Sequence, residues 1–399
     1  MIVGVVGKPN CGKSTFFKAA TLAEVEIANY PFATIKPNSG MGYVKIDDAA
    51  RQFGKVSNPR EGFVLNDKRF VPMQLIDVAG LVPGAHEGKG MGNQFLDDLR
   101  QADVLIHVVD ISGSTNDKGE PVEPGSYDPA NDIKFLEEEL DYWILRLINK
   151  GWDKFSRSVQ QTHDKVHKAI ARHLVGLGVT EELVEEVIEH SELSDKGITE
   201  WSDEDLFKLS SAIRERTKPM IIACNKIDVN GAEENFKRIK EEFPDHLLVR
   251  CSAESELALR EAAKHELISY VPGEDSFELK DEGKLSDKQK NALGFIKTNI
   301  LDKFKSTGVQ DVLDKSVFDI LKYIPIFPGG VNKLEDQNGN VLPDCFLMPM
   351  GSTALDFAYK LHTDFGDNFI RAIDVKTKRT VGKDHELKNG DIVEIVADK

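Results

Sequence analysis

Within residues 7–14, four residues stand at a spacing that can hold phosphate groups: Gly7, Gly12, Lys13 and Ser14. The stretch reads GKPNCGKS, and its glycines allow it to curl so that successive backbone N–H groups converge on phosphate oxygens. Lys13, which we expect to face solvent, supplies a positive charge for the β- and γ-phosphates, and the Ser14 hydroxyl suits Mg²⁺. We therefore predict that nucleotide phosphates are bound by Gly7, Lys8, Pro9, Asn10, Cys11, Gly12, Lys13, Ser14 and Thr15.

A second chemical signature lies at residues 225–228, which read NKID. The Asp228 carboxylate can accept hydrogen bonds from N1–H and the exocyclic amino group of guanine, and adenine offers neither donor. Losing both bonds disfavours adenine by about a hundredfold or more, because each hydrogen bond to a charged group is worth ~1.5–3 kcal/mol. We expect Asn225 to brace the loop, the Lys226 stem to pack on the base, and the backbone of Ser252, Ala253 and Glu254 to read guanine O6.

Three more residues stand where a triphosphate and its metal would be sensed. Thr34 lies in the Pro- and Gly-rich loop at residues 29–40 and can complete the Mg²⁺ shell together with Ser14. Asp77 ends an apolar run and begins D-V-A-G, which resembles the D-x-x-G element of GTPases, so Asp77 is expected to hold Mg²⁺ through water. Gly80 is expected to contact the γ-phosphate, and we assign catalytic roles to Lys13, Thr34 and Gly80. The Gly-rich stretch that follows predicts a nucleotide-dependent switch.

Short apolar runs rich in β-branched residues position these loops. They occur at residues 2–6, 70–77, 102–111 and 219–224 and predict buried strands, and a helix is predicted from Thr15 onward. Residues 128–216 carry apolar residues at helical spacing, with a capping box at Ser202 and Asp205. From residue 342 the order of strands, turns and one helix fits a small β-grasp domain. The predicted fold class is α/β: a P-loop NTPase domain with a mostly parallel sheet, an all-α insertion and a C-terminal β-grasp domain.

The predicted domain boundaries follow from the same pattern. They are 1–127 with 217–274 for the discontinuous nucleotide-binding domain, 128–216 for the helical insertion, 275–335 for a helical linker with a Pro/Gly break at PIFPGG, and 336–399 for the β-grasp domain.

Composition narrows the class of protein. The 399-residue chain is 30% charged with a formal net charge of −16, which argues against coating naked nucleic acid, and no DNA partner is expected. A local basic patch remains compatible with that charge. Four scattered cysteines without a CxxC pair favour reduced cytosolic thiols. We find no signal peptide and no stretch near the ~18 apolar residues of a membrane span, so a cytoplasmic protein without membrane contact is expected.

The stretches GKPNCGKST, NYPFATIKPN, DVAGLVPGAHEGKGMGNQFLDDLR and NKID closely resemble the Obg family of GTPases, in particular its YchF-related branch. The C-terminal segment resembles a TGS domain, and the resemblance covers nearly the whole chain. It implies a GTP/GDP-dependent switch with Mg²⁺. YchF proper replaces N-K-x-D and prefers ATP, whereas NKID is intact here, so guanine recognition is expected. An ATPase like YchF proper stays open as an alternative.

The resemblance also bears on hydrolysis and partners. Leu81 stands where many GTPases carry a water-orienting Gln, which implies slow hydrolysis or another group, with His86 as one candidate. A nucleotide-regulated binding module that scarcely turns over is therefore a second alternative. In similar GTPases without that Gln, an Asn at the position of Asn10 helps coordinate K⁺. The TGS resemblance and the basic run Lys376, Lys378, Arg379 and Lys383 point to ribosomes or structured RNA, contacted through residues 336–399 and the helical insertion.

Overall fold

The computed structural model describes residues 1–21, 39–78 and 99–398. They fall into two compact units, which we call unit 1 and unit 2. The main parts of unit 1 are Met1–Phe17 and Leu75–Glu254, and those of unit 2 are Gly40–Gln74 and Ser255–Lys399. Every helix among the described residues is too short or too polar to span a bilayer.

Unit 1 is built on parallel strands rich in β-branched residues. Across the sheet they are β1 (Ile2–Val6), β5 (Val104–Asp110), β6 (Met220–Asn225) and β7 (Leu247–Arg250). β5 and β6 are buried along their whole lengths, as expected for central strands. The end of β4 (Lys68–Asp77) also lies in this unit, where the Val78 N–H donates to the Val5 carbonyl at 3.0 Å. Asp77 therefore ends its strand next to β1.

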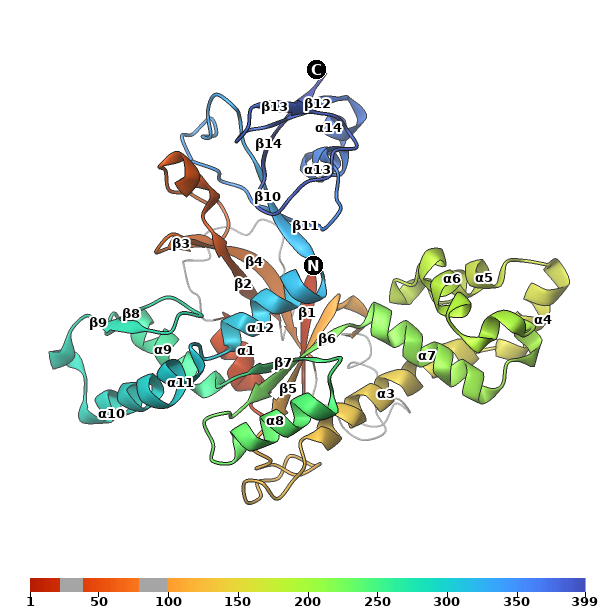
Figure 1. Ribbon diagram of the computed structural model, residues 1–399, viewed down its shortest axis with the longest axis horizontal. Helices are drawn as coiled ribbons and strands as arrows, with labels where there is room; N and C mark the ends of the chain where they lie inside the picture. Colours follow the sequence, from red (N-terminus) through yellow and green to blue (C-terminus); the bar gives the residue numbers. More distant parts are fainter. Residues whose placement is uncertain (22–38, 79–98, 399) are drawn as a thin grey trace. The chain divides into compact units, whose positions relative to one another are not determined.

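Helices fill most of the chain between β5 and β6. They are α3 (Ala130–Asn149), α4 (Trp152–Thr162), α5 (Val166–His173), α6 (Glu181–Glu189) and α7 (Asp203–Thr217), with 3₁₀ turns at Val175–Leu177, Glu192–Asp195 and Ile198–Glu200. α3 and α7 lie side by side, with Trp143 and Ile213 in one buried core (Figure 1). The predicted capping box at Ser202 and Asp205 opens α7, with Asp205 N–H to Ser202 Oγ at 3.2 Å. The all-helical insertion is confirmed. After β6 come α8 (Ala232–Glu242) and, beyond β7, α9 (Ala253–Lys264).

Unit 2 combines a β-hairpin with short helices. The strands are β2 (Ser39–Asp47), β3 (Phe63–Leu65) and the body of β4, followed later by the pair β8 (Ile268–Tyr270) and β9 (Phe277–Leu279). The helices are α10 (Asp287–Ile296), α11 (Asp302–Phe304) and α12 (Val309–Lys315), with 3₁₀ turns at Ala49–Phe53 and Glu282–Lys284 and π-helical turns at Lys297–Leu301 and Ser316–Ile320. Asp314 on α12 accepts hydrogen bonds from the Lys45 backbone at 2.7 Å and the Gln310 amide at 2.8 Å. Burial raises the pKa of Asp314 to about 7.

The C-terminal sheet of unit 2 has the β-grasp order. Its strands are β10 (Tyr323–Pro328), β11 (Phe346–Pro349), β12 (Phe369–Asp374), β13 (Arg379–Val381) and β14 (Ile392–Ala397), arranged β11-β10-β14-β12-β13. β10 and β14 are parallel neighbours, and α13 (Ala354–Leu361) packs Phe357 into the core, followed by α14 (Thr363–Asp367). The predicted α/β fold class with its C-terminal β-grasp domain is confirmed.

One expectation for the linker is wrong. Residues 323–328 form strand β10 rather than part of a helical linker with a Pro/Gly break. Pro325 lacks an N–H, but its carbonyl accepts from the Gly390 N–H at 2.9 Å, and the neighbouring Ile326 is fully buried. The apolar YIPIF run thus gains more from burial than the prolines cost the strand.

A buried arginine ties the β3–β4 hairpin to the C-terminal domain within unit 2. The Arg69 guanidinium donates to the Leu342 carbonyl at 2.5 Å and the Pro343 carbonyl at 3.0 Å. It also lies 5.3 Å from the ring of Phe327. Main-chain hydrogen bonds from Asn58 to Val341 and from Arg60 to Pro343 extend the contact. The C-terminal domain is therefore packed against this hairpin rather than tethered by a free linker.

Candidate nucleotide-binding site

The phosphate loop, residues 7–14, runs from β1 into α1 (Lys13–Thr21). The Phe16 N–H donates to the Gly12 carbonyl at 2.8 Å, so the helix begins two residues before the predicted Thr15. Gly12 has φ of +95°, and a Cβ there would lie 2.1 Å from the Asn225 amide nitrogen. No other residue fits, because the backbone conformation and the space both demand glycine. The loop thus presents the N-terminus of a helix, which favours anions.

The prediction that Lys13 faces solvent is wrong. Its ammonium group forms an ion pair with Asp77 and donates to the Val78 carbonyl at 2.9 Å. The two side chains are only 13% and 24% exposed. The local sequence could not reveal this pair, because its members are far apart in the chain and meet only when β4 lies beside β1. A phosphate that binds Lys13 would have to draw it away from Asp77.

The sequence predicts that Asn225 braces its own loop, and in the structure its side chain joins that loop to two others. Its side-chain amide donates to the Cys11 carbonyl at 2.9 Å and its oxygen accepts from the Ala253 N–H at 3.0 Å. The side chain is 3% exposed, so both bonds are shielded from water. Cys11 is fully buried under the loop, and burial raises the pKa of its thiol to about 12. The phosphate loop and the two base-side loops are therefore locked to one another through Asn225.

A cavity of about 490 Å³ lies where these loops meet. It is lined by Lys8, Pro9, Asn10, Gly12, Lys13, Ser14, Thr15, Asn225, Lys226, Asp228, Val229 and Glu254. Asp228 is exposed, and one of its oxygens accepts from the Ser252 hydroxyl at 2.8 Å. That bond fixes the carboxylate while its other oxygen has no partner among the described residues. The structure thus brings most of the predicted phosphate and base residues to one site, whereas Gly7, Cys11, Ser252 and Ala253 do not line the cavity.

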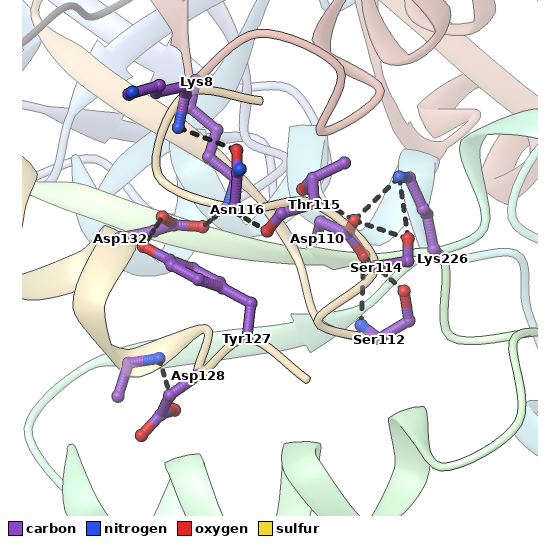
Figure 2. A network of polar contacts seen from close by, with 12 residues as sticks. Lys8, Asp110, Ser112, Ser114, Thr115, Asn116, Tyr127, Asp128, Asp132 and Lys226 are labelled. Carbon is purple, nitrogen blue, oxygen red and sulfur yellow. Dashed lines mark hydrogen bonds and ion pairs between the residues drawn. The ribbon is translucent and has the colours of Figure 1, made fainter. Parts of the chain in front are cut away.

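Asp110, at the end of β5, holds Lys226 in place. The Lys226 ammonium donates to Asp110 Oδ2 at 2.8 Å and lies 3.3 Å from the Ser114 hydroxyl (Figure 2). The hydroxyls of Ser112 and Thr115 donate to the same carboxylate at 2.5 and 2.9 Å. Burial alone would raise the pKa of Asp110, but the hydrogen bonds from Lys226 and Ser112 outweigh it and hold the pKa below its ordinary value. Asp110 therefore stays charged and anchors the ammonium group of Lys226, a residue that lines the cavity.

The loop at residues 111–129 supports the phosphate loop from outside. The Lys8 ammonium pairs with Asp132 at 2.8 Å, donates to the Thr115 carbonyl at 2.9 Å and lies 3.9 Å from the ring centroid of Tyr127 (Figure 2). Lys8 is 6% exposed, so it can offer a nucleotide only its main chain. The Asn10 amide donates to the Gly119 carbonyl at 2.9 Å.

Sequence reasoning missed this supporting role of the 111–129 loop. One signal was an aspartate that ends the mostly apolar run VLIHVVD, since a buried carboxylate needs a cationic partner. The other was glycine in the polar stretch that follows. Gly119 has φ of +79°, and a Cβ there would lie 2.5 Å from the Pro9 carbonyl oxygen, so the loop can approach the phosphate loop only with glycine at this position.

Several predicted residues lie outside the described part of the chain. They are Thr34, Gly80, Leu81 and His86. Of the expected Mg²⁺ ligands, the Ser14 hydroxyl is exposed at the start of α1, and Asp77 is present at the end of β4. Within the described residues, no three His, Cys, Asp or Glu side chains gather as a metal site. One hydroxyl and one carboxylate fit Mg²⁺, which binds through few protein ligands and takes the rest from phosphates and water.

Three family models match the chain. Residues 2–150 match the 50S ribosome-binding GTPase model, and residues 223–330 match the G4 motif-containing domain of YGR210-like, Obg-like GTPases. Residues 337–397 match the TGS domain. The matches follow the chain order of the phosphate loop, the NKID loop and the β-grasp sheet.

Whole-length relatives extend these matches. The uncharacterized GTP-binding protein MJ1332 of Methanocaldococcus jannaschii is 47% identical over 99% of both chains. The crystal structure of a GTP binding protein from Pyrococcus horikoshii OT3 is 42% identical with a TM-score of 0.79, covering 100% of both chains. The ribosome-binding ATPase YchF of Buchnera aphidicola is 27% identical over 98% of this chain and 97% of its own. The chain therefore belongs to the YchF-related, TGS-containing branch of the Obg-like GTPases.

Proposed function

We propose that this protein binds GTP and GDP in the 490 Å³ cavity and hydrolyses GTP to GDP and phosphate as a nucleotide-dependent switch. The observation that supports this most is the meeting of the phosphate loop and the NKID loop in one cavity, locked together by Asn225. In this division of the chain, residues 1–127 and 217–274 carry the nucleotide chemistry. Residues 128–216 and 336–399 contact the partner.

The phosphates would lie on the main chain of residues 7–14 at the N-terminus of α1, with Lys13 moved from Asp77 to the β- and γ-phosphates. Mg²⁺ would be held by Ser14 and Asp77, joined by Thr34. When bound, the ion neutralises charge on the β- and γ-phosphate oxygens. Asn10 would contribute to a K⁺ ion its amide oxygen, which has no partner among the described residues, since the Gly119 carbonyl already accepts from its amide N–H.

The base would lie between Asp228 and the Lys226 stem. Asp228 is exposed and held by Ser252, so its carboxylate is ready to accept from N1–H and the amino group of guanine. Adenine would leave this carboxylate without donors, a loss of about a hundredfold or more in affinity. Because the NKID motif is intact, we expect the site to prefer GTP over ATP, whereas the relative YchF of Buchnera aphidicola is named an ATPase. Labelled GTP competed with ATP tests it: equal competition by ATP would support the ATPase alternative.

Slow turnover follows from Leu81, because a leucine side chain neither orients nor deprotonates water. The catalytic roles proposed for Lys13, Thr34 and Gly80 then need help from His86 or from a partner. Single-turnover GTP hydrolysis, measured with and without ribosomes, separates the two models. Acceleration by ribosomes supports the switch, and an unchanged, near-zero rate supports a binding module that scarcely turns over.

We propose the ribosome or another structured RNA of the cytoplasm as the partner. One support is that a whole-length relative is named as ribosome-binding. Another is that Lys376, Lys378, Arg379 and Lys383 are all exposed around the β12–β13 turn, in a protein with a net charge of −16. Phosphate backbones are the natural counter-charge for such a run.

Cosedimentation with ribosomes tests the partner. We expect stronger association with a non-hydrolysable GTP analogue than with GDP, weaker association at high salt, and a loss in the variant Lys376→Glu/Lys378→Glu. Removing residues 336–399 would be a poor substitute, because it strips the buried Arg69 of both carbonyl partners. The variant Lys237→Glu/Lys240→Glu, two exposed lysines of α8, is the matched control. The proposal would be contradicted if ribosome association were the same with either nucleotide and were unchanged in the Lys376→Glu/Lys378→Glu variant.

A further inference from the structure

The insertion separates its charges between helices. Residues 150–173, which span α4 and α5, contain six Lys or Arg, two Asp and no Glu. Residues 181–195, which include α6, contain seven Asp or Glu and no Lys or Arg. In a chain with a net charge of −16, the α4–α5 hairpin is thus a local reversal of sign.

Most of these cations are available for a partner. Lys150, Lys154, Arg157 and Lys165 are exposed, and no ion pair joins them to a carboxylate of the described residues. Lys154 and Arg157 are three residues apart on α4, a spacing that places them on one helical face. On α5, Lys168 pairs with Glu181 at 3.1 Å and Arg172 pairs with Asp164, both at exposed sites where such pairs are weak and easily exchanged.

A cavity of about 280 Å³ lies between the two helices. Phe155, Val159 and Ala169 supply apolar lining, and the polar lining is supplied by Ser158, Thr162, Asp164, Arg172 and His173. The Phe155 ring lies 4.8 Å from the ring of His173 at a tilt of 31°. The volume falls just below the ~300–1,000 Å³ of sites for drug-sized ligands, which suits one planar ring system.

We propose that the α4–α5 hairpin binds RNA, with phosphates on Lys154, Arg157 and Lys165 and one unstacked base in the Phe155 cavity. The proposal rests on the proposed association with ribosomes or structured RNA and specifies where the insertion makes that contact. RNA-binding modules that read single-stranded loops stack splayed bases on aromatic rings beside cationic side chains. An acidic peptide would satisfy the cations but would make no use of the aromatic cavity, so RNA fits both features.

Fluorescence anisotropy on the full-length protein tests the surface. The probes are a fluorescein-labelled RNA hairpin with an unpaired loop and a blunt RNA duplex of the same length. Lys154→Glu/Arg157→Glu should weaken binding of both probes about tenfold or more. It should also make the slope of log K against log salt shallower by about 1.4 for the unpaired loop, two phosphate contacts at ~0.7 each. Lys237→Glu/Lys240→Glu on α8 changes the charge equally and should bind within about twofold of the original protein.

The cavity has its own variant. Ser158 is exposed, so Ser158→Trp fills the cavity without changing charge or burying a polar group. This variant should weaken binding of the RNA hairpin probe about tenfold and leave binding of the RNA duplex unchanged. Equal losses for both probes would overturn the base pocket, and an α4 variant that binds as well as the α8 control would overturn the whole surface. Tighter binding of labelled poly-glutamate than of the hairpin would also overturn it, in favour of a protein partner.

The outcome is separable from that of the proposed function. Circular dichroism and GTP affinity, measured on each variant, should match the original protein because no altered residue lines the nucleotide cavity. If the protein cosediments with ribosomes while Lys154→Glu/Arg157→Glu binds the RNA hairpin as tightly as the original protein, this surface is refuted and the ribosomal partner stands. If the hairpin binds through α4 but ribosomes do not cosediment, the ribosomal partner is refuted and this surface stands.

Discussion

Replacing Asp110 by asparagine should damage nucleotide binding although Asp110 contacts no nucleotide in the proposed mode. Its carboxylate accepts from the Lys226 ammonium at 2.8 Å, from the hydroxyls of Ser112, Ser114 and Thr115 at 2.5, 2.8 and 2.9 Å, and from the Ser112 N–H at 3.2 Å. Asparagine keeps the size but turns one acceptor oxygen into a donor. The new amide N–H group therefore points at a group that is itself a donor, either the Ser112 N–H or the Lys226 ammonium. The substitution also leaves Lys226 without its counter-ion.

The magnitude follows from these contacts. A lost hydrogen bond to a charged group costs ~1.5–3 kcal/mol, and breaking a fully buried ion pair costs ~3–5 kcal/mol. Lys226 is 27% exposed, so water compensates part of its loss. We expect the free energy of unfolding to fall by about 2–4 kcal/mol. We also expect the Kd for GTP to rise about tenfold to a hundredfold, or ~1.4–2.7 kcal/mol, because the Lys226 stem is no longer held over the base.

Urea unfolding measures the first quantity, and titration with a fluorescent GTP analogue measures the second at a temperature where both proteins are folded. Asp128→Asn is the control, since its pair with Arg238 is 48% and 44% exposed and should be worth ~1 kcal/mol or less. A double-mutant cycle with Lys226→Met tests the route, because Asp110→Asn should then change the Kd little further. An Asp110→Asn protein that loses stability but binds GTP unchanged would refute the positioning role.

Three further predictions concern the base, the cation and pH. Asp228→Asn should shift preference from GTP to xanthosine triphosphate, measured by competition, and unchanged GTP affinity would show that Asp228 does not read the base. Hydrolysis should be faster in KCl than in NaCl at equal ionic strength if Asn10 helps hold K⁺, and equal rates would remove that role. Burial raises the pKa of Asp314 from 3.8 to about 7, so folding favours its protonated form. The free energy of unfolding should fall as pH rises from 3.8 to about 7, and Asp314→Asn should flatten urea-measured stability over that range, whereas an unchanged slope would assign it to other groups.

The fold was largely predictable because its signals are local. The strands β1, β5 and β6 were predicted from apolar runs that end at or just before polar or loop residues, and the start of α7 was predicted from the capping box at Ser202. β10 was missed because the prolines of PIFPGG dominate a local reading, whereas its partners β11 and β14 lie farther along the chain. Strand status there is decided by long-range pairing and burial rather than by propensity.

The candidate site was predictable in its motifs but not in its supports. The bracing role of Asn225 was predictable, because an amide can both donate and accept, but the two loops that it joins were not. The partners of Lys8 and Lys13 were not predictable, because Asp132 and Asp77 reach them only through tertiary packing. A lysine in a phosphate loop carries the same letter whether its ammonium faces a phosphate or a carboxylate of the protein.

The ion pair between Lys13 and Asp77 has a consequence for the order in which ligands arrive. Under the proposed roles, a nucleotide without metal takes Lys13 and leaves the Asp77 carboxylate facing phosphate charge, while Mg²⁺ alone takes Asp77 and faces the displaced ammonium. Each ligand alone thus meets a charge of its own sign, whereas the preformed Mg²⁺–triphosphate complex satisfies both residues at once. Metal and nucleotide should therefore bind with positive cooperativity. The same coupling acts in the opposite direction after hydrolysis. When Mg²⁺ and phosphate leave, the ion pair between Lys13 and Asp77 can form again, and its formation favours the release of product.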